Sequence, residues 1–404
     1  MIQTIKTNSS ALVIIDSDAD GFTSSALLIN YLHDLFPAWV ENKLRYILHQ
    51  GKQHGLSDCI DDIVKTDYKL IIVPDAGSND VIECAKLRTY GKGIIVLDHH
   101  LCDVTNPDAI VINNQLSKYP NKELSGVGIV WQFCRYIDKL LNTSYADYYL
   151  DLVALGNCAD MMSMTSIETK HLINKGFNNV HNPFFYYLSQ KNEYSMKGKI
   201  NHTSVAFYIA PYLNAMCRSG TQEEKLITFK SMLKHEAFKI VPSTKRGHSF
   251  GETEKLVEQA MRVVTNVKTR QTKVQDAGIE MLEDMIEQQH LLNHKVLLFL
   301  LEPGQVEKNI AGLIANKFQA KYQRPCCILT KVIEEEKIDV KYTETFDNFF
   351  DIPTPIKITY QGSARGCNEV GVKEFKSLCA GTGLCEYCTG HEGAFGLGIR
   401  EENI

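Results

Sequence analysis

In the stretch Ile14-Ile15-Asp16-Ser17-Asp18-Ala19-Asp20-Gly21 the chain passes from apolar to acidic residues, and this stretch decides the fold. Residues 11–15 form a short, largely β-branched run, which is typical of a buried parallel strand. The acids alternate with small residues, so an extended backbone would point all three carboxylates to one side. Gly21 permits a tight turn, and residues 22–35 carry apolar side chains at helical spacing. The sequence therefore predicts a strand, an acidic turn and a helix.

Three further acidic clusters follow apolar runs. Asp75 follows residues 70–73, Asp98-His99-His100 follows residues 93–97, and Asp160 ends the segment 154–160. Helical segments separate the runs, and ligands of open parallel sheets gather beyond the carboxyl ends of the strands. We therefore expect an α/β fold with a doubly wound parallel sheet, whose carboxyl edge brings the four clusters together.

Clustered carboxylates indicate a metal site. They repel one another and have raised pKa values unless a cation neutralises them. Oxygen ligands with one or two imidazoles suit Mn²⁺ or Mg²⁺, whereas thiolate-rich sets suit Zn²⁺. Such a set can hold two ions about 3.5–4 Å apart, an arrangement that activates water for phosphoester cleavage. A single Asp at a strand end is often only a helix cap or a turn former, but four clusters in this order favour metal.

The four clusters resemble the motifs of the DHH phosphoesterases, with DSDADG, the lone Asp75, Asp98-His99-His100 and Asp160 in that order. The stretches between them resemble the RecJ-type single-strand-specific exonucleases of that family in particular. They read NNQ at 113–115, LSGVG at 124–128, LDLVALG at 150–156 and IAPYLNAMCR at 209–218. The resemblance runs from about residue 9 to the C-terminus.

This resemblance implies metal-dependent hydrolysis of phosphodiester bonds. The ions would activate water and neutralise the oxygens that gain charge in the transition state. Asp16 and Asp98 would either coordinate a metal or orient its ligands from behind, and His100 would contact the scissile phosphate or assist proton transfer. The expected direct ligands are Asp18, Asp20, Asp75, His99 and Asp160.

Length and composition indicate a soluble intracellular enzyme. The chain has 404 residues, no apolar stretch as long as a membrane span, and an N-terminus without the pattern of a signal peptide. Its 12 Cys lie scattered through apparent core segments, which is typical of reduced thiols. We expect a cytoplasmic location and no membrane contact.

The pattern of strands and helices divides the chain into three parts. Residues 1–190 alternate strand and helix signals and carry the acidic clusters, so we expect them to form the catalytic DHH domain. Residues 191–293 are expected to form a helical connector, with one long helix over 252–290. From residue 294 a smaller α/β pattern begins with the apolar run 295–301, and it resembles the DHH-associated C-terminal domain.

Charge is unevenly distributed along the chain. A net charge of −5 argues against nucleic-acid binding, because phosphate contacts use Lys and Arg. Between residues 230 and 273, however, the net charge is +6 with His neutral. The alternatives there are an ordinary solvated surface and a nucleic-acid groove, and the resemblance favours the groove.

Two glycine-rich stretches, 362–366 and 390–398, are candidates for phosphate binding. Glycine lets the backbone approach an anion, and Arg can hold a phosphate with two parallel hydrogen bonds. A purely structural turn is the alternative. Both stretches resemble substrate-binding motifs of the family. With the 209–218 segment, the resemblance assigns substrate contacts to Asn214, Arg218, Ser363, Arg365, Gly390 and His391.

The chain departs from the family pattern at several positions. Tyr212 stands where the family usually has Arg, Cys217 where it usually has Gly, and Cys388-Thr389 where further glycines are expected. Bacterial RecJ-type enzymes commonly append an OB-like module that extends the grip on single strands. We expect this chain to be a core without that extension, with weaker holding of long strands, lower processivity or reliance on a partner.

Four cysteines of the C-terminal part form a second candidate metal site. One CxxC pair with two more Cys nearby has the spacing of a structural Zn²⁺ site. Cytosolic thiols also occur as plain core residues, and no second CxxC pair is present. Bound Zn²⁺ would brace the loop that presents His391. The candidate ligands are Cys367, Cys379, Cys385 and Cys388.

The resemblance implies an exonuclease that acts on single-stranded nucleic acid, DNA rather than RNA, with 5′ to 3′ degradation in recombination, repair or replication as the expectation. The expected partner is a single-strand-binding protein or a helicase. One alternative is a nanoRNase or cyclic-dinucleotide phosphodiesterase, although these usually lack a segment like 209–218 and the long helix. The other is an inactive nucleic-acid-binding subunit, which would not need a repulsive acid cluster. Polarity, minimum substrate length and oligomeric state stay open.

Overall fold

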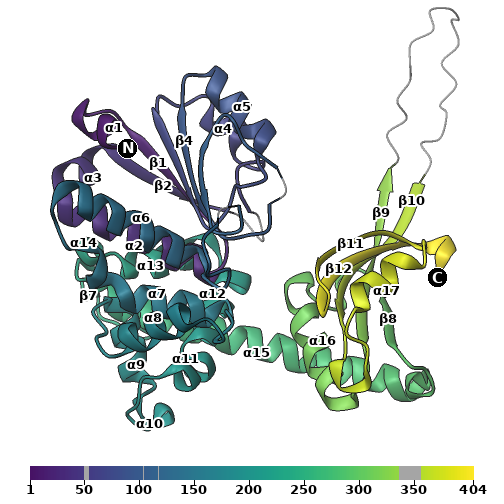
Figure 1. Cartoon of the computed structure of the whole chain (residues 1–404). Coiled ribbons are helices and arrows are strands. Elements are labelled where there is room, and N and C mark those ends of the chain that lie inside the picture. Colours follow the sequence, from purple (N-terminus) through teal and green to yellow (C-terminus); the bar gives the residue numbers. More distant parts are fainter. Residues whose placement is uncertain (50–53, 103, 117, 336–355) are drawn as a thin grey trace, which may run out of the picture. The chain divides into compact units, whose positions relative to one another are not determined.

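The computed structural model describes residues 1–49, 54–102, 104–116, 118–335 and 356–404. The chain forms two compact units, an N-terminal unit of Met1–Thr269 and a C-terminal unit of Arg270–Ile404 (Figure 1). The boundary between them falls inside helix α15 (Leu256–Gln288). Residues 191–269, which the sequence placed in a connector, belong by their contacts to the N-terminal unit.

The N-terminal unit is built on a five-stranded parallel sheet. The registers of Ala11 with Leu70 and of Leu70 with Gly93 align three of its strands. The chain order reverses between the second and third strands, and open parallel sheets bind ligands beyond such a switch point. The strands predicted over 11–15, 70–73 and 93–97 are confirmed. In spatial order the strands are β2 (Leu44–Leu48), β1 (Ala11–Ile15), β3 (Leu70–Pro74), β4 (Gly93–Asp98) and β5 (Ile110–Asn113).

Helices cover both faces of this sheet. All five residues of β1 are buried, with Val13 in one core and Ile14 in the other. The doubly wound fold is therefore confirmed. One face carries α2 (Ala19–Leu35), α6 (Gly126–Leu141) and α7 (Leu150–Ala159), and the other carries α4 (Ile60–Ile63) and α5 (Val81–Thr89).

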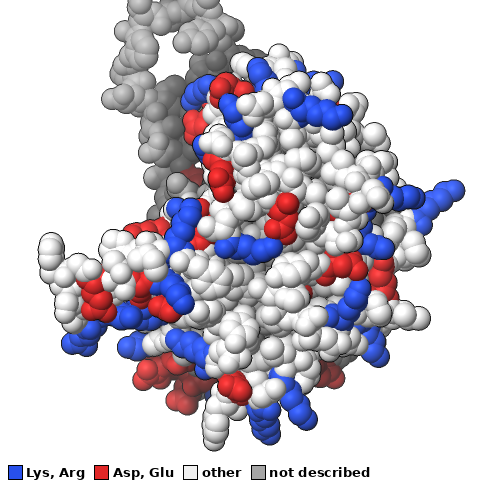
Figure 2. Space-filling model, turned by 90° about the vertical axis from the view of Figure 1, so that its left-hand side faces the viewer, with Lys and Arg blue, Asp and Glu red and all other residues white. Residues whose placement is uncertain are grey.

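Further helices complete the N-terminal unit. On the face drawn in Figure 2, Lys and Arg side chains are intermixed with Asp and Glu. None of the helices that the structure describes is long and apolar enough to cross a lipid bilayer. The further helices of the N-terminal unit are α1 (Ile2–Lys6), α3 (Pro37–Lys43), the 3₁₀ helix Ala146–Tyr149, α8 (Ile167–Phe177), α9 (Pro183–Lys191), α10 (Glu193–Met196), α11 (His202–Tyr208), α12 (Ala210–Ser219), α13 (Gln222–Met232) and α14 (Lys234–Ala237).

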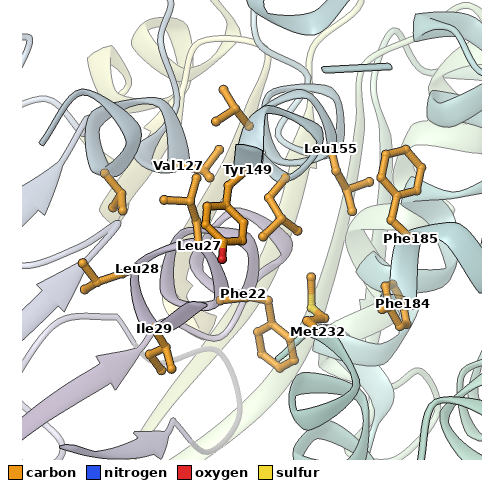
Figure 3. Packing of buried hydrophobic residues seen from close by; sticks show 14 of the residues in the cluster. Phe22, Leu27, Leu28, Ile29, Val127, Tyr149, Leu155, Phe184, Phe185 and Met232 are labelled. Carbon is orange, nitrogen blue, oxygen red and sulfur yellow. The ribbon is translucent and has the colours of Figure 1, made fainter. Parts of the chain in front are cut away.

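The largest core is packed around α2. Side chains of α2, α6, α7 and the later helices meet in one cluster (Figure 3). Phe22 packs edge-on against Phe229 of α13, with ring centroids 5.6 Å apart. Burying a side chain of this size stabilises the fold by roughly 1.5–3 kcal/mol. This packing fixes the first turns of α2, where Asp20 lies.

The long helix predicted over 252–290 is α15, which is shorter at both ends. Strand β7 (Thr253–Lys255) pairs with β6 (Ile240–Pro242) and delays the start of the helix. At the other end His290 has φ 51°, a left-handed conformation that cannot continue a helix.

The C-terminal unit contains a mixed five-stranded sheet. The strand predicted at 295–301 is confirmed as β8, which pairs parallel with β9, and the other pairings are antiparallel. One face is covered by α16 (Lys308–Tyr322) and the other by α17 (Phe375–Gly381). In spatial order the strands are β11 (Cys385–His391), β12 (Ala394–Arg400), β10 (Ile356–Arg365), β9 (Cys326–Glu335) and β8 (Leu297–Leu301), and the 3₁₀ helices are Leu291–Asn293, Asn368–Val370 and Glu401–Asn403.

Candidate active site

The acidic residues of the four motifs converge at the carboxyl edge of the N-terminal sheet. Asp16 follows β1, Asp75 follows β3 and Asp98 ends β4, and these strands are neighbours. The fourth motif reaches the same place from a helix, because Asp160 is the C-terminal cap of α7. We call the group that meets here the acid cluster, and it consists of Asp16, Asp18, Asp20, Asp75, His99 and Asp160.

The acidic turn differs from the extended run that its alternation predicted. Helix α2 begins at Ala19, so Asp18 is its N-terminal cap and accepts a hydrogen bond from Gly21 N at 2.9 Å. Asp20 lies in the first turn, where the helix dipole favours a carboxylate. Capping starts the helix three residues earlier than the apolar spacing indicated. The three acids therefore enter the site through a strand end, a cap and a helical turn.

His99 lies at the centre of the acid cluster. Its Nε2 is 3.3 Å from Asp75 Oδ1 and 3.8 Å from Oδ2 of both Asp20 and Asp160. The structure thus brings the five predicted metal ligands together, with Asp16 and His100 beside them. Three sets of ligand atoms each lie within 4.8 Å of one another, namely Asp75 with His99 and His100, Asp20 with His99 and Asp160, and Asp16 with Asp18 and Asp75.

Close packing around the acids explains two of the glycine-containing stretches. A Cβ at Gly126 would collide with Asp75 Oδ1, and one at Gly156 would lie 2.6 Å from Asp20 Oδ1. The LSGVG and LDLVALG stretches therefore let α6 and α7 approach the carboxylates. Asp75 itself has φ 68°, a left-handed conformation that is costly for a residue other than glycine and that gathers at functional sites.

Asp16, Asp20 and Asp75 are buried, whereas Asp18 is partly buried and Asp160 is exposed, and several oxygens of the buried carboxylates are unsatisfied. Asp20 accepts hydrogen bonds from Gly126 N at 2.6 Å and from Val127 N at 3.1 Å, at the start of α6. Within the described part of the chain, neither buried oxygen of Asp75 accepts a hydrogen bond, and nor does Oδ1 of Asp16. An unpartnered buried carboxylate is costly unless a cation coordinates it. The donor set therefore fits a divalent metal.

Burial and mutual repulsion raise the pKa values of these acids. Burial, with the charge of Asp18 nearby, raises the pKa of Asp20 to about 7. Burial, with Asp20 and Asp18 nearby, raises the pKa of Asp160 to about 8. The pKa of Asp75 is raised well above its usual value by burial and by the surrounding carboxylates. A cation bound among them would stabilise the charged forms and reverse these shifts.

Asp98 holds the two histidines from behind. Its Oδ1 accepts a hydrogen bond from His99 N at 2.7 Å and lies 2.8 Å from His100 Nδ1, while Oδ2 accepts one from Ser78 N at 3.0 Å. Burial would raise the pKa of Asp98, but these hydrogen bonds and the charge of His100 outweigh it and hold the pKa well below its usual value. Asp98 is thus placed to orient the His100 imidazole and to fix the backbone at His99.

The two histidines have opposite protonation preferences. Burial and the charge of His100 lower the pKa of His99 to about 4, which leaves a neutral imidazole suited to a metal. The hydrogen bond with Asp98 raises the pKa of His100 to about 9, so His100 is a cation near pH 7. Its side chain is 47% exposed. A charged, exposed donor beside the acid cluster is placed to bind a phosphate oxygen.

His54 is a residue of this site that the sequence did not reveal. Its Nδ1 lies 2.6 Å from Asp16 Oδ2, and this hydrogen bond raises the pKa of His54. Leu56 N donates to Asp80 Oδ2 at 2.7 Å and anchors the loop. The sequence signal was a His-Gly pair after a strand, which is too common to identify a site.

The segment that carries most of the acid cluster matches a known protein family. The model of the DHH family, N-terminal domain, matches residues 10–157. Residues 10–157 are a DHH-family domain. The matched range contains the first three acidic motifs, and Asp160 follows directly after it.

Relatives extend the similarity over the whole chain. It is 34% identical over 405 residues to a protein named as an SPbeta prophage-derived single-strand DNA-specific exonuclease, YorK, of Bacillus subtilis (strain 168). It is 26% identical over 416 residues to the single-stranded-DNA-specific exonuclease RecJ of the same strain. Both alignments cover 100% of this chain, which spans 65% of the length of the first relative and 45% of the second.

Solved structures share the fold of both units. RecJ from Thermus thermophilus in complex with Mn²⁺ matches with a TM-score of 0.72 at 18% identity, over 99% of this chain and 51% of that chain. A structure of exonuclease RecJ bound to manganese matches with a TM-score of 0.70 at 18% identity, over 99% of this chain and 88% of that chain. At such identity the likeness concerns the fold alone.

Next to the DHH domain, α12 carries two of the predicted substrate contacts. Asn214 Nδ2 donates to Ala159 O at 3.4 Å, so Asn214 lies beside the end of α7 that presents Asp160. Arg218 is exposed and follows one turn later on the same helical face, whereas Cys217 is buried. Both polar side chains therefore lie on the face of α12 that approaches the DHH domain.

The C-terminal unit brings its predicted substrate residues to one face of its sheet. Arg365 of β10 pairs with Ala394 of β12, which pairs in turn with His391 of β11. Directly paired residues share a face, so the small Ala394 separates the two polar side chains. Ser363 lies on the same face, two residues before Arg365. Gly390 has φ 125°, a conformation that favours glycine, just before His391.

Three of the four candidate Zn²⁺ ligands, Cys379, Cys385 and Cys388, lie near one another, and Cys367 has other partners. Cys379, Cys385 and Cys388 border the apolar cluster beneath α17. Cys367 is buried and contacts Gln319 Nε2 at 3.2 Å. Among the residues that the structure describes, these thiols do not form a set as tight as those of the acid cluster. The Zn²⁺ site stays a prediction.

The basic segment 230–273 is partly neutralised by acids. Arg262 pairs with Glu254, whose side chain is buried, and Lys239 pairs with Glu236. The nucleic-acid groove expected from this segment stays a prediction.

Proposed function

We propose that the chain is a metal-dependent exonuclease that hydrolyses phosphodiester bonds of single-stranded DNA. The observation that carries this proposal is the state of Asp75. Neither of its buried oxygens has a hydrogen-bond partner among the described residues, and Oδ1 lies 3.3 Å from Nε2 of a neutral His99. The names of the relatives support the choice of substrate. Oxygen donors with one neutral imidazole suit Mn²⁺ first and Mg²⁺ second.

Each side chain of the site has a distinct task in this proposal. Two bound cations would lower the pKa of a water molecule and neutralise charge that develops on the phosphate oxygens. His100, charged and exposed, donates to a phosphate oxygen, and Asp98 holds its ring in place. Asp16 is fixed by His54 and supports the ligands from the end of β1. The residues that would hold the cations are Asp18, Asp20, Asp75, His99 and Asp160.

The strand is proposed to be held through its phosphates. Arg365 can grip a phosphate with two parallel hydrogen bonds, and His391 shares its face of the sheet. Ser363 and the Gly390 backbone would add neutral contacts, while Asn214 and Arg218 would serve the same role on α12. None of these contacts reads a base edge, so the activity would not depend on sequence.

The cellular role is a further part of the proposal and rests on the resemblance to the RecJ-type exonucleases. We propose degradation from the 5′ end in recombination, repair or replication, in the cytoplasm. A single-strand-binding protein or a helicase would deliver the strand, and the oligomeric state is left open.

The function is tested with end-labelled single strands of graded length, DNA and RNA, with and without a 5′ phosphate, in Mn²⁺. Release of mononucleotides from the 5′ end of long DNA is expected. Cleavage confined to di- to pentanucleotides would instead assign the protein to the nanoRNase class. Strands of every length that stay intact would contradict the proposal.

A further inference from the structure

Met161, the residue after Asp160, combines two unfavourable features. Its backbone has φ 55°, the left-handed conformation that normally takes Gly or Asn at the end of a helix. Its side chain is 88% exposed. A flexible apolar side chain therefore projects into solvent from a strained backbone, at the end of α7 that carries a predicted metal ligand.

Leu101 has a similar place on the other side of the acid cluster. It directly follows His99 and His100 and is 76% exposed, and its carbonyl accepts a hydrogen bond from Asn79 Nδ2 at 3.2 Å. The segments that carry Leu101 and Met161 meet where His99 Nε2 lies 3.8 Å from Asp160 Oδ2. Two exposed apolar side chains thus border a site whose other residues are acids and imidazoles.

We infer that Met161 and Leu101 form a nucleobase-binding edge for the nucleotide whose phosphate lies at the acid cluster. This inference rests on the proposed function. A nucleobase is the flat, largely apolar group that a nucleic-acid strand places close to a phosphate. Met is polarisable and adapts to different aromatic faces, and Leu offers no hydrogen bond that would read a base edge. Such an edge would hold any of the four bases, as a sequence-independent exonuclease requires.

A single exposed Leu or Met on a surface is ordinary and needs no explanation. Here the two flank the same pair of predicted ligands, and one of them occupies a backbone conformation that glycine would adopt without strain. Met161→Gly should therefore leave the fold intact or stabilise it slightly, so a loss of function in this variant would not reflect unfolding.

The test pairs this variant with removal of the base from the substrate. Single-stranded DNA with a normal residue, or with an abasic residue at the first, second or third position from the attacked end, is cleaved by wild type and by Met161→Gly in Mn²⁺. At one of these positions, wild type should lose about tenfold in kcat/KM when the base is removed, a typical value for one stacked base. On the normal strand, kcat/KM of Met161→Gly should be about tenfold lower than that of wild type. Removal of the base should then lower kcat/KM of the variant little further.

Two outcomes would overturn the inference while leaving the function intact. In the first, Met161→Gly slows normal and abasic strands equally; in the second, it slows neither. Leu101→Ala should repeat the pattern, and Tyr194→Ala, at a side chain 97% exposed on α10, should match wild type on every strand. If wild type cleaves no strand at all, the proposed function fails and the inference with it.

Discussion

The N-terminal acid cluster and the C-terminal face that carries Ser363, Arg365 and His391 are assembled in different ways. The acids come from segments more than 140 positions apart, yet the parallel strands that carry Asp16, Asp75 and Asp98 all end at one edge. In the C-terminal unit, the antiparallel register places Arg365 and His391 on either side of Ala394 of β12. The first site is buried and electrostatically stressed, whereas the second is more exposed and unstrained at Arg365 and His391.

This difference suggests a division of labour. Buried carboxylates without hydrogen bonds store unfavourable energy that a cation relieves, so the N-terminal site should control metal binding and the chemical step. Partly exposed cationic and neutral donors gain modest energy from a phosphate, so the C-terminal face should control affinity for the strand. Variants of the two regions should therefore fail in different measurements.

Asp75→Asn should produce the largest effect. Losing a central ligand should lower kcat by about a thousandfold or more, because metal activation of water supplies several kcal/mol. The metal-free variant should unfold at the same or a higher temperature than wild type, because it lacks a buried carboxyl group whose pKa is raised well above its usual value. Activity with Mn²⁺ and thermal unfolding with chelator measure the two effects. Asp62→Asn, at an exposed acid of α4, is the matched control, and near-normal activity of Asp75→Asn would refute the ligand assignment.

Arg365→Ala should have an intermediate effect of a different kind. Loss of a charge-assisted contact should lower kcat/KM by about tenfold to a hundredfold, mainly through KM, and leave the affinity for Mn²⁺ unchanged. Steady-state kinetics and Mn²⁺ titration separate the two quantities. Arg400→Ala removes a cation of the same sheet that pairs with Glu386 and should behave as wild type. Weaker Mn²⁺ binding by Arg365→Ala would abolish the proposed division.

The pH dependence of stability should be smaller but distinctive. Asp20, with its pKa raised to about 7, and His100, with its pKa raised to about 9, both hold protons in the folded state that the unfolded chain releases at lower pH. The contribution of each group to the free energy of unfolding is therefore lost as pH rises. The pKa of His99 is lowered to about 4, so its effect on the free energy of unfolding no longer changes above pH 6.5. Without metal, the unfolding temperature should fall by roughly a few degrees between pH 6.5 and 8.5.

Mn²⁺ should restore much of that loss at pH 8.5, because it binds the deprotonated acids. Thermal scans with chelator and with Mn²⁺ at the two pH values provide the check. If the unfolding temperature of the metal-free protein rose between pH 6.5 and 8.5, the pKa values of Asp20 and His100 would not be raised in the folded state.

Loss of a structural Zn²⁺ from the C-terminal unit should have the smallest effect on activity. If the C-terminal thiols hold a structural Zn²⁺, the purified and folded protein should contain about one equivalent, and Cys385→Ser should lower both zinc content and unfolding temperature without changing kcat. Elemental analysis decides the point. Less than about half an equivalent of zinc in a folded sample would remove this site.

Much of the first site could be predicted from sequence, because parallel strands impose one rule on every segment. An apolar run followed by an acid places that acid at the carboxyl edge, whichever strand carries it. Asp160 reached the same point from the end of a helix, and Asp18 and Asp20 through a cap and a helical turn, so their local geometry was not predicted. His54 was missed because its role depends on a loop that Asp80 anchors, which has no sequence pattern.

The second site was predictable only through resemblance. Arg365 and His391 are 26 positions apart, and nothing in the residues alone fixes the antiparallel register that brings them to either side of Ala394. The same limit applies to the start of α15, where pairing of β6 with β7 overrides a sequence that would continue as helix. Pairing between distant strands decides both cases.

Calorimetric titration of the chelator-treated protein with Mn²⁺ at pH 7, in buffers of different ionisation enthalpy, tests the acid cluster most directly. Asp20 and Asp160, with pKa values of about 7 and about 8, carry protons that a bound cation must displace. We therefore predict two Mn²⁺ per chain, bound with measurable proton release. Absence of binding, or binding without proton release, would contradict the account.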